Sequence, residues 1–122
     1  MKKIHYNKLI RDKIPQKIAR SGGSFRVRVL KPKEFEKELL KKVEEEASAL
    51  SVVKSRVELI SELTDVLDVI DEIKLVKKIT PSELARAKRE NFKKKGGFKK
   101  RLYLHWAEDT GYRTNEKRGR KR

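Results

Sequence analysis

Residues 34–78 decide the fold, and they read EFEKELLKKVEEEASALSVVKSRVELISELTDVLDVIDEIKLVKK. Their apolar residues recur every three or four positions, which is the spacing of one face of an α-helix. In a first predicted helix, over about residues 34–53, the apolar stripe contains Phe35, Leu39, Leu40, Val43, Ala47 and Leu50. In a second, over about residues 56–78, it contains Leu59, Leu63, Val66, Leu67, Ile70 and Ile73. The pattern predicts two amphipathic helices that pack together through these stripes.

Shorter elements are predicted on either side of this helix pair. A short helix near the start of the chain should end at Gly22-Gly23, since helices often end at glycine. Phe25–Leu30 alternates apolar and basic residues, which predicts an extended segment with one buried face. Thr80–Glu83 combines a cap, a first-turn proline and a capping glutamate, so a further helix should begin there and end at Gly96-Gly97. The sequence therefore predicts an all-α protein with a short extended N-terminal segment.

Composition excludes several classes of protein. The chain has 122 residues and no cysteine, which allows one modest domain and excludes disulfides and thiolate metal sites. It contains no apolar run long enough to span a bilayer, and no apolar stretch of a signal peptide follows its basic start. We therefore expect a cytoplasmic protein without a membrane partner.

The net charge of +16 is unevenly distributed. Residues 34–72 carry twelve acids and five bases, and the segments on both sides are basic. An acidic centre between basic ends suits a metal site that also attracts polyphosphate, and it suits a solubilising acidic helix pair equally well. Residues 105–122 are polar and rich in Lys and Arg, which predicts a mobile basic tail after a domain over residues 1–104.

Three acidic side chains are predicted to meet where the two central helices pack. Glu46 lies at the centre of an apolar stripe, where a carboxylate must be paired, protonated or bound to a cation. Glu62 and Asp65 are three residues apart and therefore share one face of the next helix. Such a group suits Mg²⁺ or Mn²⁺, which prefer oxygen ligands. The alternative is that these acids, with Glu45 and Asp68 beside them, form solvated helix faces.

The same residues resemble a known family. Lys41–Ala47 (KKVEEEA) followed by Glu62–Ile70 (ELTDVLDVI) resembles the Glu-Glu-x-x-Glu and Glu-x-x-Asp motifs of the MazG-like, all-α nucleoside triphosphate pyrophosphohydrolases. That superfamily includes phosphoribosyl-ATP pyrophosphohydrolase and dimeric dUTPase. Tyr6–Pro15 (YNKLIRDKIP) and Lys94–Leu104 (KKGGFKKRLYL) are similar to the two ends of a short, stand-alone branch. The resemblance covers about residues 4–104. It implies a helical bundle of the all-α NTP pyrophosphatase type that forms a dimer or larger homo-oligomer.

The resemblance also implies a reaction and assigns residues to it. Such proteins use Mg²⁺ to split a nucleoside triphosphate into the monophosphate and pyrophosphate. It implies metal ligands at Glu46, Glu62 and Asp65, with Asp68 as an auxiliary ligand. It implies catalytic roles for Glu45 and Glu46, with Glu45 orienting the attacking water. The candidates for binding the polyphosphate come from the two terminal motifs and are Asn7, Lys8, Arg11, Lys94 and Lys95.

One position departs from the family pattern. When Glu45 and Glu46 occupy the first two acids of the motif, the third acid, a metal ligand in the family, falls on Ala49. Loss of one carboxylate lowers metal affinity, because the charge of the ligands sets that affinity. Three interpretations of the function therefore stay open, one of which is a purely structural helical oligomer. The second is a pyrophosphohydrolase whose activity is weakened by the missing metal ligand at Ala49, and the third is a non-catalytic relative that binds nucleotides or nucleic acid through its basic flanks.

Overall fold

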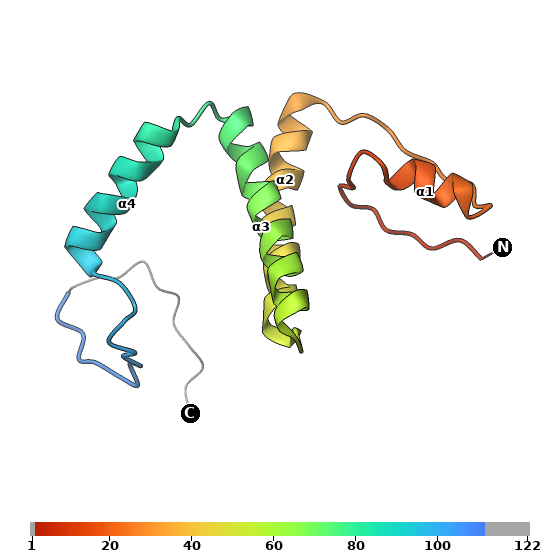
Figure 1. The fold of residues 1–122 in the computed structure, drawn as a ribbon. Coiled ribbons are helices and arrows are strands. Elements are labelled where there is room, and N and C mark those ends of the chain that lie inside the picture. Colours follow the sequence, from red (N-terminus) through yellow and green to blue (C-terminus); the bar gives the residue numbers. More distant parts are fainter. Residues whose placement is uncertain (1, 112–122) are drawn as a thin grey trace. The chain divides into compact units, whose positions relative to one another are not determined.

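The computed structural model describes residues 2–111, and within this range it contains helices and no strand (Figure 1). The elements are α1 (Ile14–Arg20), α2 (Pro32–Ser48), the 3₁₀ turn η1 (Ala49–Val52), α3 (Arg56–Val76) and α4 (Pro81–Lys95). The all-α prediction is confirmed for these residues, while the pyrophosphatase-type bundle stays a prediction. No described helix combines the length and the apolar character that crossing a bilayer requires.

The chain divides into two compact units, Met1–Ala85 and Arg86–Arg122. The predicted domain over residues 1–104 spans parts of both units, and its boundary stays a prediction. Most of the predicted basic tail, residues 112–122, lies outside the described residues. Residues 105–111 belong to no helix or strand and are exposed.

Polar side chains three residues apart fix where α3 and α4 begin. The Thr80 hydroxyl accepts a hydrogen bond from the Glu83 N–H at 3.1 Å, and the Glu83 carboxylate accepts one from the Thr80 N–H at 3.1 Å. This reciprocal pair satisfies amides that have no partner inside the helix. The predicted start of α4 is therefore confirmed. Ser55 caps α3 in the same way by accepting from the Glu58 N–H at 3.1 Å.

Glycine ends the first and the last helix. Gly22 has a φ of +81° and Gly96 a φ of +75°, a backbone conformation that glycine adopts without a Cβ clash. At α1 the N–H of Gly23 donates to the Ile18 carbonyl at 3.0 Å, and at α4 the N–H of Gly96 donates to the Phe92 carbonyl at 2.8 Å. Both predicted helix ends are confirmed.

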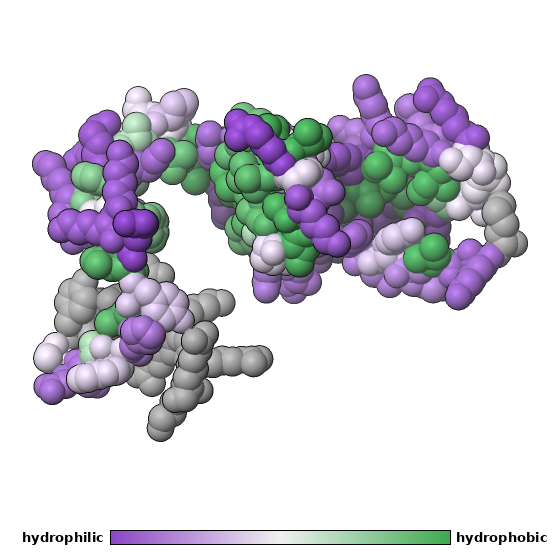
Figure 2. All heavy atoms as spheres, turned by 60° about the horizontal axis from the view of Figure 1, so that its bottom comes forward, coloured by the Kyte–Doolittle hydropathy of each residue, from purple (hydrophilic) through white to green (hydrophobic). Residues whose placement is uncertain are grey.

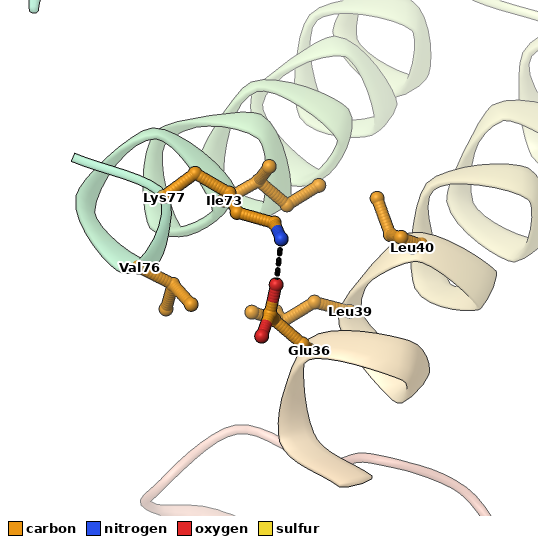
Figure 3. A pocket seen from close by; sticks show the side chains of 6 residues that line it. All are labelled: Glu36, Leu39, Leu40, Ile73, Val76 and Lys77. Atoms are coloured by element: carbon orange, nitrogen blue, oxygen red, sulfur yellow. Dashed lines mark ion pairs between the residues drawn. The ribbon is translucent and has the colours of Figure 1, made fainter. Parts of the chain in front are cut away.

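Helices α2 and α3 lie side by side and antiparallel, connected through η1 (Figure 1). Leu39 of α2, with 4% of its surface exposed, is the one buried residue among those described. At the open end of the pair an ion pair joins Lys77 to Glu36 across a small hollow (Figure 3). The side chains that line the hollow with them are Leu39, Leu40, Ile73 and Val76. The contact between the helices therefore involves part of the predicted stripes, with Leu39 of the first and Ile73 of the second among its residues. Three residues of the second predicted stripe are exposed: Leu59, Leu63 and Leu67.

The prediction of a buried face for Phe25–Leu30 is wrong. The segment belongs to no helix or strand, as expected of an extended stretch, but Phe25, Val27 and Val29 are exposed, Val29 to 98%. Alternating residues bury one face only when a neighbouring strand or helix covers it. The described part of the chain contains no strand that could pair with this segment.

Part of the apolar surface of the helix pair is uncovered. Ile60, Leu63 and Leu67 of α3 are exposed, and their spacing of three and four residues places them in one row along the helix. Figure 2 shows apolar surface over the α2–α3 pair. Contiguous apolar surface of this kind usually marks a site of association.

Candidate metal centre

The antiparallel packing of α2 and α3 brings three carboxylates together. Each of Glu46 from α2 and Glu62 and Asp65 from α3 offers an oxygen, and these three oxygens lie within 4.8 Å of one another. All three residues are half-buried. The predicted convergence of these residues is confirmed. It results from the position of Glu46 inside an apolar stripe and from the three-residue spacing that stacks Glu62 and Asp65 on one face.

The donor set fits a divalent cation. Two oxygens bound to one octahedral Mg²⁺ at about 2.1 Å each lie about 3.0 Å apart in adjacent positions and about 4.2 Å apart in opposite positions. The three carboxylate oxygens, at 4.8 Å or less, would have to approach one another by up to about 1.8 Å to bind one ion. Oxygen ligands of this charge suit Mg²⁺ and Mn²⁺. Exposed acidic groups also occur widely without an ion, so the geometry permits a metal and does not require one.

A lysine on α2 offsets part of the negative charge. Lys42 lies one turn before the acids, and its Nζ is 3.4 Å from a Glu46 oxygen and 3.2 Å from a Glu45 oxygen. Only 14% of the Lys42 side chain is exposed, so its stem packs along the helix pair while its amine reaches the carboxylates. Lys42 is not among the site residues predicted above. The spacing of three and four residues to Glu45 and Glu46 is the signal that predicts it.

Two further cations reach the cluster from the N-terminal segment. Lys8 Nζ is 2.6 Å from Glu45 Oε1. The two terminal guanidinium nitrogens of Arg11 lie 3.0 Å from Asp65 Oδ1 and 2.9 Å from Asp68 Oδ2. The predicted substrate-binding residues Lys8 and Arg11 are therefore close to the acidic cluster. In the structure Lys8 binds Glu45 beside the cluster, and Arg11 binds Asp65 of the cluster and Asp68 beside it.

The remaining predicted substrate-binding residues differ in position. Asn7 directly precedes Lys8 and has a φ of 47°, a left-handed conformation that asparagine tolerates better than most residues. Lys94 and Lys95 end α4, in the second compact unit. A contact of any of these three with a substrate stays a prediction.

Pairing shifts the pKa values at the edge of the cluster. The hydrogen bond from Lys8 is the main cause that lowers the pKa of Glu45 below 4.5, and the same bond raises the pKa of Lys8. The hydrogen bond to Asp68 is the main cause that raises the pKa of Arg11. Glu45 is therefore ionised at neutral pH and is a weaker base than an unpaired glutamate.

The two other acids that the sequence singled out lie at the edge of the cluster. Glu45 pairs with Lys8 and Lys42, and Asp68 pairs with Arg11, so both carboxylates are next to the three central ones. Neither is in the group whose oxygens lie within 4.8 Å of one another. The auxiliary metal role of Asp68 and the catalytic role of Glu45 stay predictions.

Ala49 lies where α2 ends. The Ser48 hydroxyl donates to the Glu45 carbonyl at 2.7 Å, and the Ser51 hydroxyl donates to the Ser48 carbonyl at 3.2 Å. Such bonds compete with the backbone ladder of an α-helix. The helix accordingly changes to the 3₁₀ turn η1 at Ala49, before the predicted end at residue 53. Ala49, the position at which the resemblance expects a fourth carboxylate, is thus the half-buried first residue of this turn.

Comparisons with family models, with curated proteins and with solved structures give no match to this chain. The likeness of its motifs to the MazG-like family therefore stays a prediction from the sequence.

Proposed function

We propose that this protein hydrolyses a nucleoside triphosphate, or a related nucleotide, to the monophosphate and pyrophosphate with Mg²⁺, and that Mn²⁺ can replace Mg²⁺. The observation that carries the proposal is the meeting of Glu46, Glu62 and Asp65 within 4.8 Å. The motif resemblance supports it, because these three acids are the ones that the family motifs assign to the metal.

In this proposal Glu46, Glu62 and Asp65 hold the ion. A divalent ion bound there neutralises phosphate charge and lowers the pKa of a bound water. The water oxygen forms a bond to the α-phosphorus, the bond from that phosphorus to the bridging oxygen breaks, and pyrophosphate leaves. Glu45, whose carboxylate Lys8 holds in the ionised form, would orient the water by accepting a hydrogen bond from it and would take its proton as the bond to phosphorus forms.

The cations of the N-terminal segment bind the phosphates. Lys8 lies 2.6 Å from Glu45 beside the cluster and Arg11 lies 3.0 Å from Asp65 in it, so a nucleotide phosphate bound there is within their reach. When Asp65 ligates the ion, Arg11 loses one of its two carboxylate partners, and its guanidinium becomes able to donate to a phosphate oxygen. Arg11 thus serves as a counter-ion of the acids without substrate and as a phosphate ligand with it.

The test is a pyrophosphate-release assay over a panel of nucleoside triphosphates with Mg²⁺ and with Mn²⁺. We expect release that Glu62→Gln abolishes and that Glu72→Gln, an exposed acid of α3 outside the cluster, leaves unchanged. Ala49→Glu should increase release at low metal concentration, because a fourth carboxylate raises metal affinity. If neither the wild type nor Ala49→Glu releases pyrophosphate from any nucleotide, the proposal that this protein is a pyrophosphohydrolase is refuted.

The absence of an acid at position 49 favours a second candidate, a protein that binds the same nucleotides without hydrolysing them. Three carboxylates hold an ion more weakly than the four that the family motifs supply, because the charge of the ligands sets the affinity. The position of the missing acid, Ala49, lies on the 3₁₀ turn η1 beyond the end of α2. Calorimetric titration with a non-hydrolysable triphosphate distinguishes the two. Metal-dependent binding of this triphosphate, together with no pyrophosphate release from hydrolysable nucleotides, would support the non-catalytic nucleotide-binding protein.

A further inference from the structure

The second half of α4 and the segment after it form a strongly basic surface. Residues 86–106, which we call the basic arm, contain nine Lys and Arg and one acid, Glu90. The residues of the arm are exposed throughout. Glu90 pairs with Arg86 at 3.3 Å, and the other cations of the arm have no ion pair within the described part of the chain. The arm therefore presents eight unpaired positive charges to solvent.

Three of its cations share one face of α4. Arg86, Arg89 and Lys93 line a shallow surface hollow together with Glu90. They are three and four residues apart, so they follow one another along the helix at a spacing of about 5 to 6 Å. A row of cations of this kind suits an extended polyanion better than a single compact anion.

Aromatic rings alternate with these cations. Phe92, Phe98, Tyr103 and Trp106 are exposed to between 66% and 93%. The chain turns at Gly96-Gly97, where Gly96 has a φ of +75° and a Cβ on Gly97 would come within 3.2 Å of the Phe92 ring. Four exposed rings in 21 residues are costly in water, and their flat faces suit stacking on bases.

We infer that the basic arm binds single-stranded nucleic acid, with Arg89 and Lys93 on phosphates and Phe98 and Trp106 stacked on unpaired bases. Basic grooves with exposed aromatic rings are how proteins bind single strands without reading their sequence. A membrane surface fits less well, because α4 has cations around most of its circumference and lacks the broad apolar face of an interfacial helix. This function is independent of the acidic cluster.

Fluorescence anisotropy of the full chain with labelled 20-nucleotide oligo-U and oligo-dT tests the inference. We expect binding to both, with an affinity that falls steeply as salt increases. Arg89→Gln/Lys93→Gln should reduce the slope of log affinity against log salt by about 1.4, since each phosphate contact contributes about 0.7 for a single strand. Phe98→Ala/Trp106→Ala removes two stacked bases and should weaken binding by about 30-fold or more at constant net charge.

Matched controls separate the arm from the charge of the whole chain. Lys17→Gln/Arg20→Gln removes the same two charges from α1, and Phe25→Ala removes an exposed ring elsewhere. Both should bind like the wild type, as should Glu62→Gln. Equal losses in arm and control variants would overturn the inference. So would equal affinity for a 20-base-pair duplex with no effect of the aromatic substitutions, or tighter binding to anionic phospholipid vesicles than to either oligonucleotide.

Discussion

Arg11→Gln should strengthen metal binding and weaken nucleotide binding at the same site. The guanidinium lies 3.0 Å from Asp65 Oδ1, and an ion bound to that oxygen lies about 2.1 Å beyond it. The two positive centres are then about 5 Å apart at most. A single and a double charge at that distance repel by about 1.7 kcal/mol in water. Because Arg11 is more than half exposed, salt and solvent reduce this to about 1 kcal/mol, which corresponds to about fivefold tighter binding of the ion.

The nucleotide should respond in the opposite direction. A hydrogen bond between charged groups contributes about 1.5 to 3 kcal/mol, so loss of the Arg11 contact to phosphate should lower kcat/KM about 10- to 100-fold. Titration of Mn²⁺ followed by electron paramagnetic resonance measures the first effect, and pyrophosphate release at saturating Mn²⁺ measures the second.

Arg28→Gln is the matched control, because Arg28 pairs with Glu34 at 2.8 Å and belongs to no part of the cluster. It should change neither quantity. Weaker or unchanged binding of Mn²⁺ to Arg11→Gln, or an equal change in Arg28→Gln, would refute the role of Arg11 as a counter-ion that the metal displaces.

Three further predictions concern the acids and the exposed face of α3. Glu46→Gln should weaken Mn²⁺ binding at least tenfold without lowering the thermal midpoint, because it removes a ligand and also relieves repulsion; a lower midpoint with unchanged Mn²⁺ binding would contradict this. Lys8→Gln should be less stable than the wild type at neutral pH and equally stable in acid. The ion pair with Lys8 holds the pKa of Glu45 below 4.5, so the contribution of this pair to the free energy of unfolding exists above that pH and disappears as pH falls through the lowered pKa. Denaturant unfolding of the wild type and Lys8→Gln at pH 7 and pH 3 measures this contribution, and a difference in stability that does not change with pH would count against it. The wild type should sediment as a dimer or larger species, and Leu63→Lys/Leu67→Lys, which charges the exposed row of α3, should sediment as a monomer; a monomeric wild type would exclude this association.

Local signals in the sequence predict most of the helices and the central acids. The Thr80–Glu83 cap and the glycines at 22 and 96 act through nearby backbone groups, so their effect can be read from neighbouring residues. The meeting of Glu46, Glu62 and Asp65 follows from helical periodicity once the two stripes are packed together.

Features that depend on the path of the whole chain could not be predicted in this way. Arg11 contacts Asp65 and Asp68, which are 54 and 57 residues away, and no local pattern indicates which acids it pairs with. The exposure of Phe25–Leu30 was missed because alternation does not reveal whether a partner covers the segment. The change to a 3₁₀ turn at Ala49 depends on hydroxyl bonds of Ser48 and Ser51, which compete weakly with the helix ladder.

Equilibrium binding of Mn²⁺ to the full chain tests the central claim most directly, because it asks whether the three carboxylates form a metal site apart from any turnover. We predict one saturable site that Glu62→Gln eliminates, that Glu72→Gln leaves intact and that Ala49→Glu strengthens. Binding that is not saturable, or that is equal in Glu62→Gln and Glu72→Gln, would show that Glu46, Glu62 and Asp65 form an acidic surface and not a metal centre.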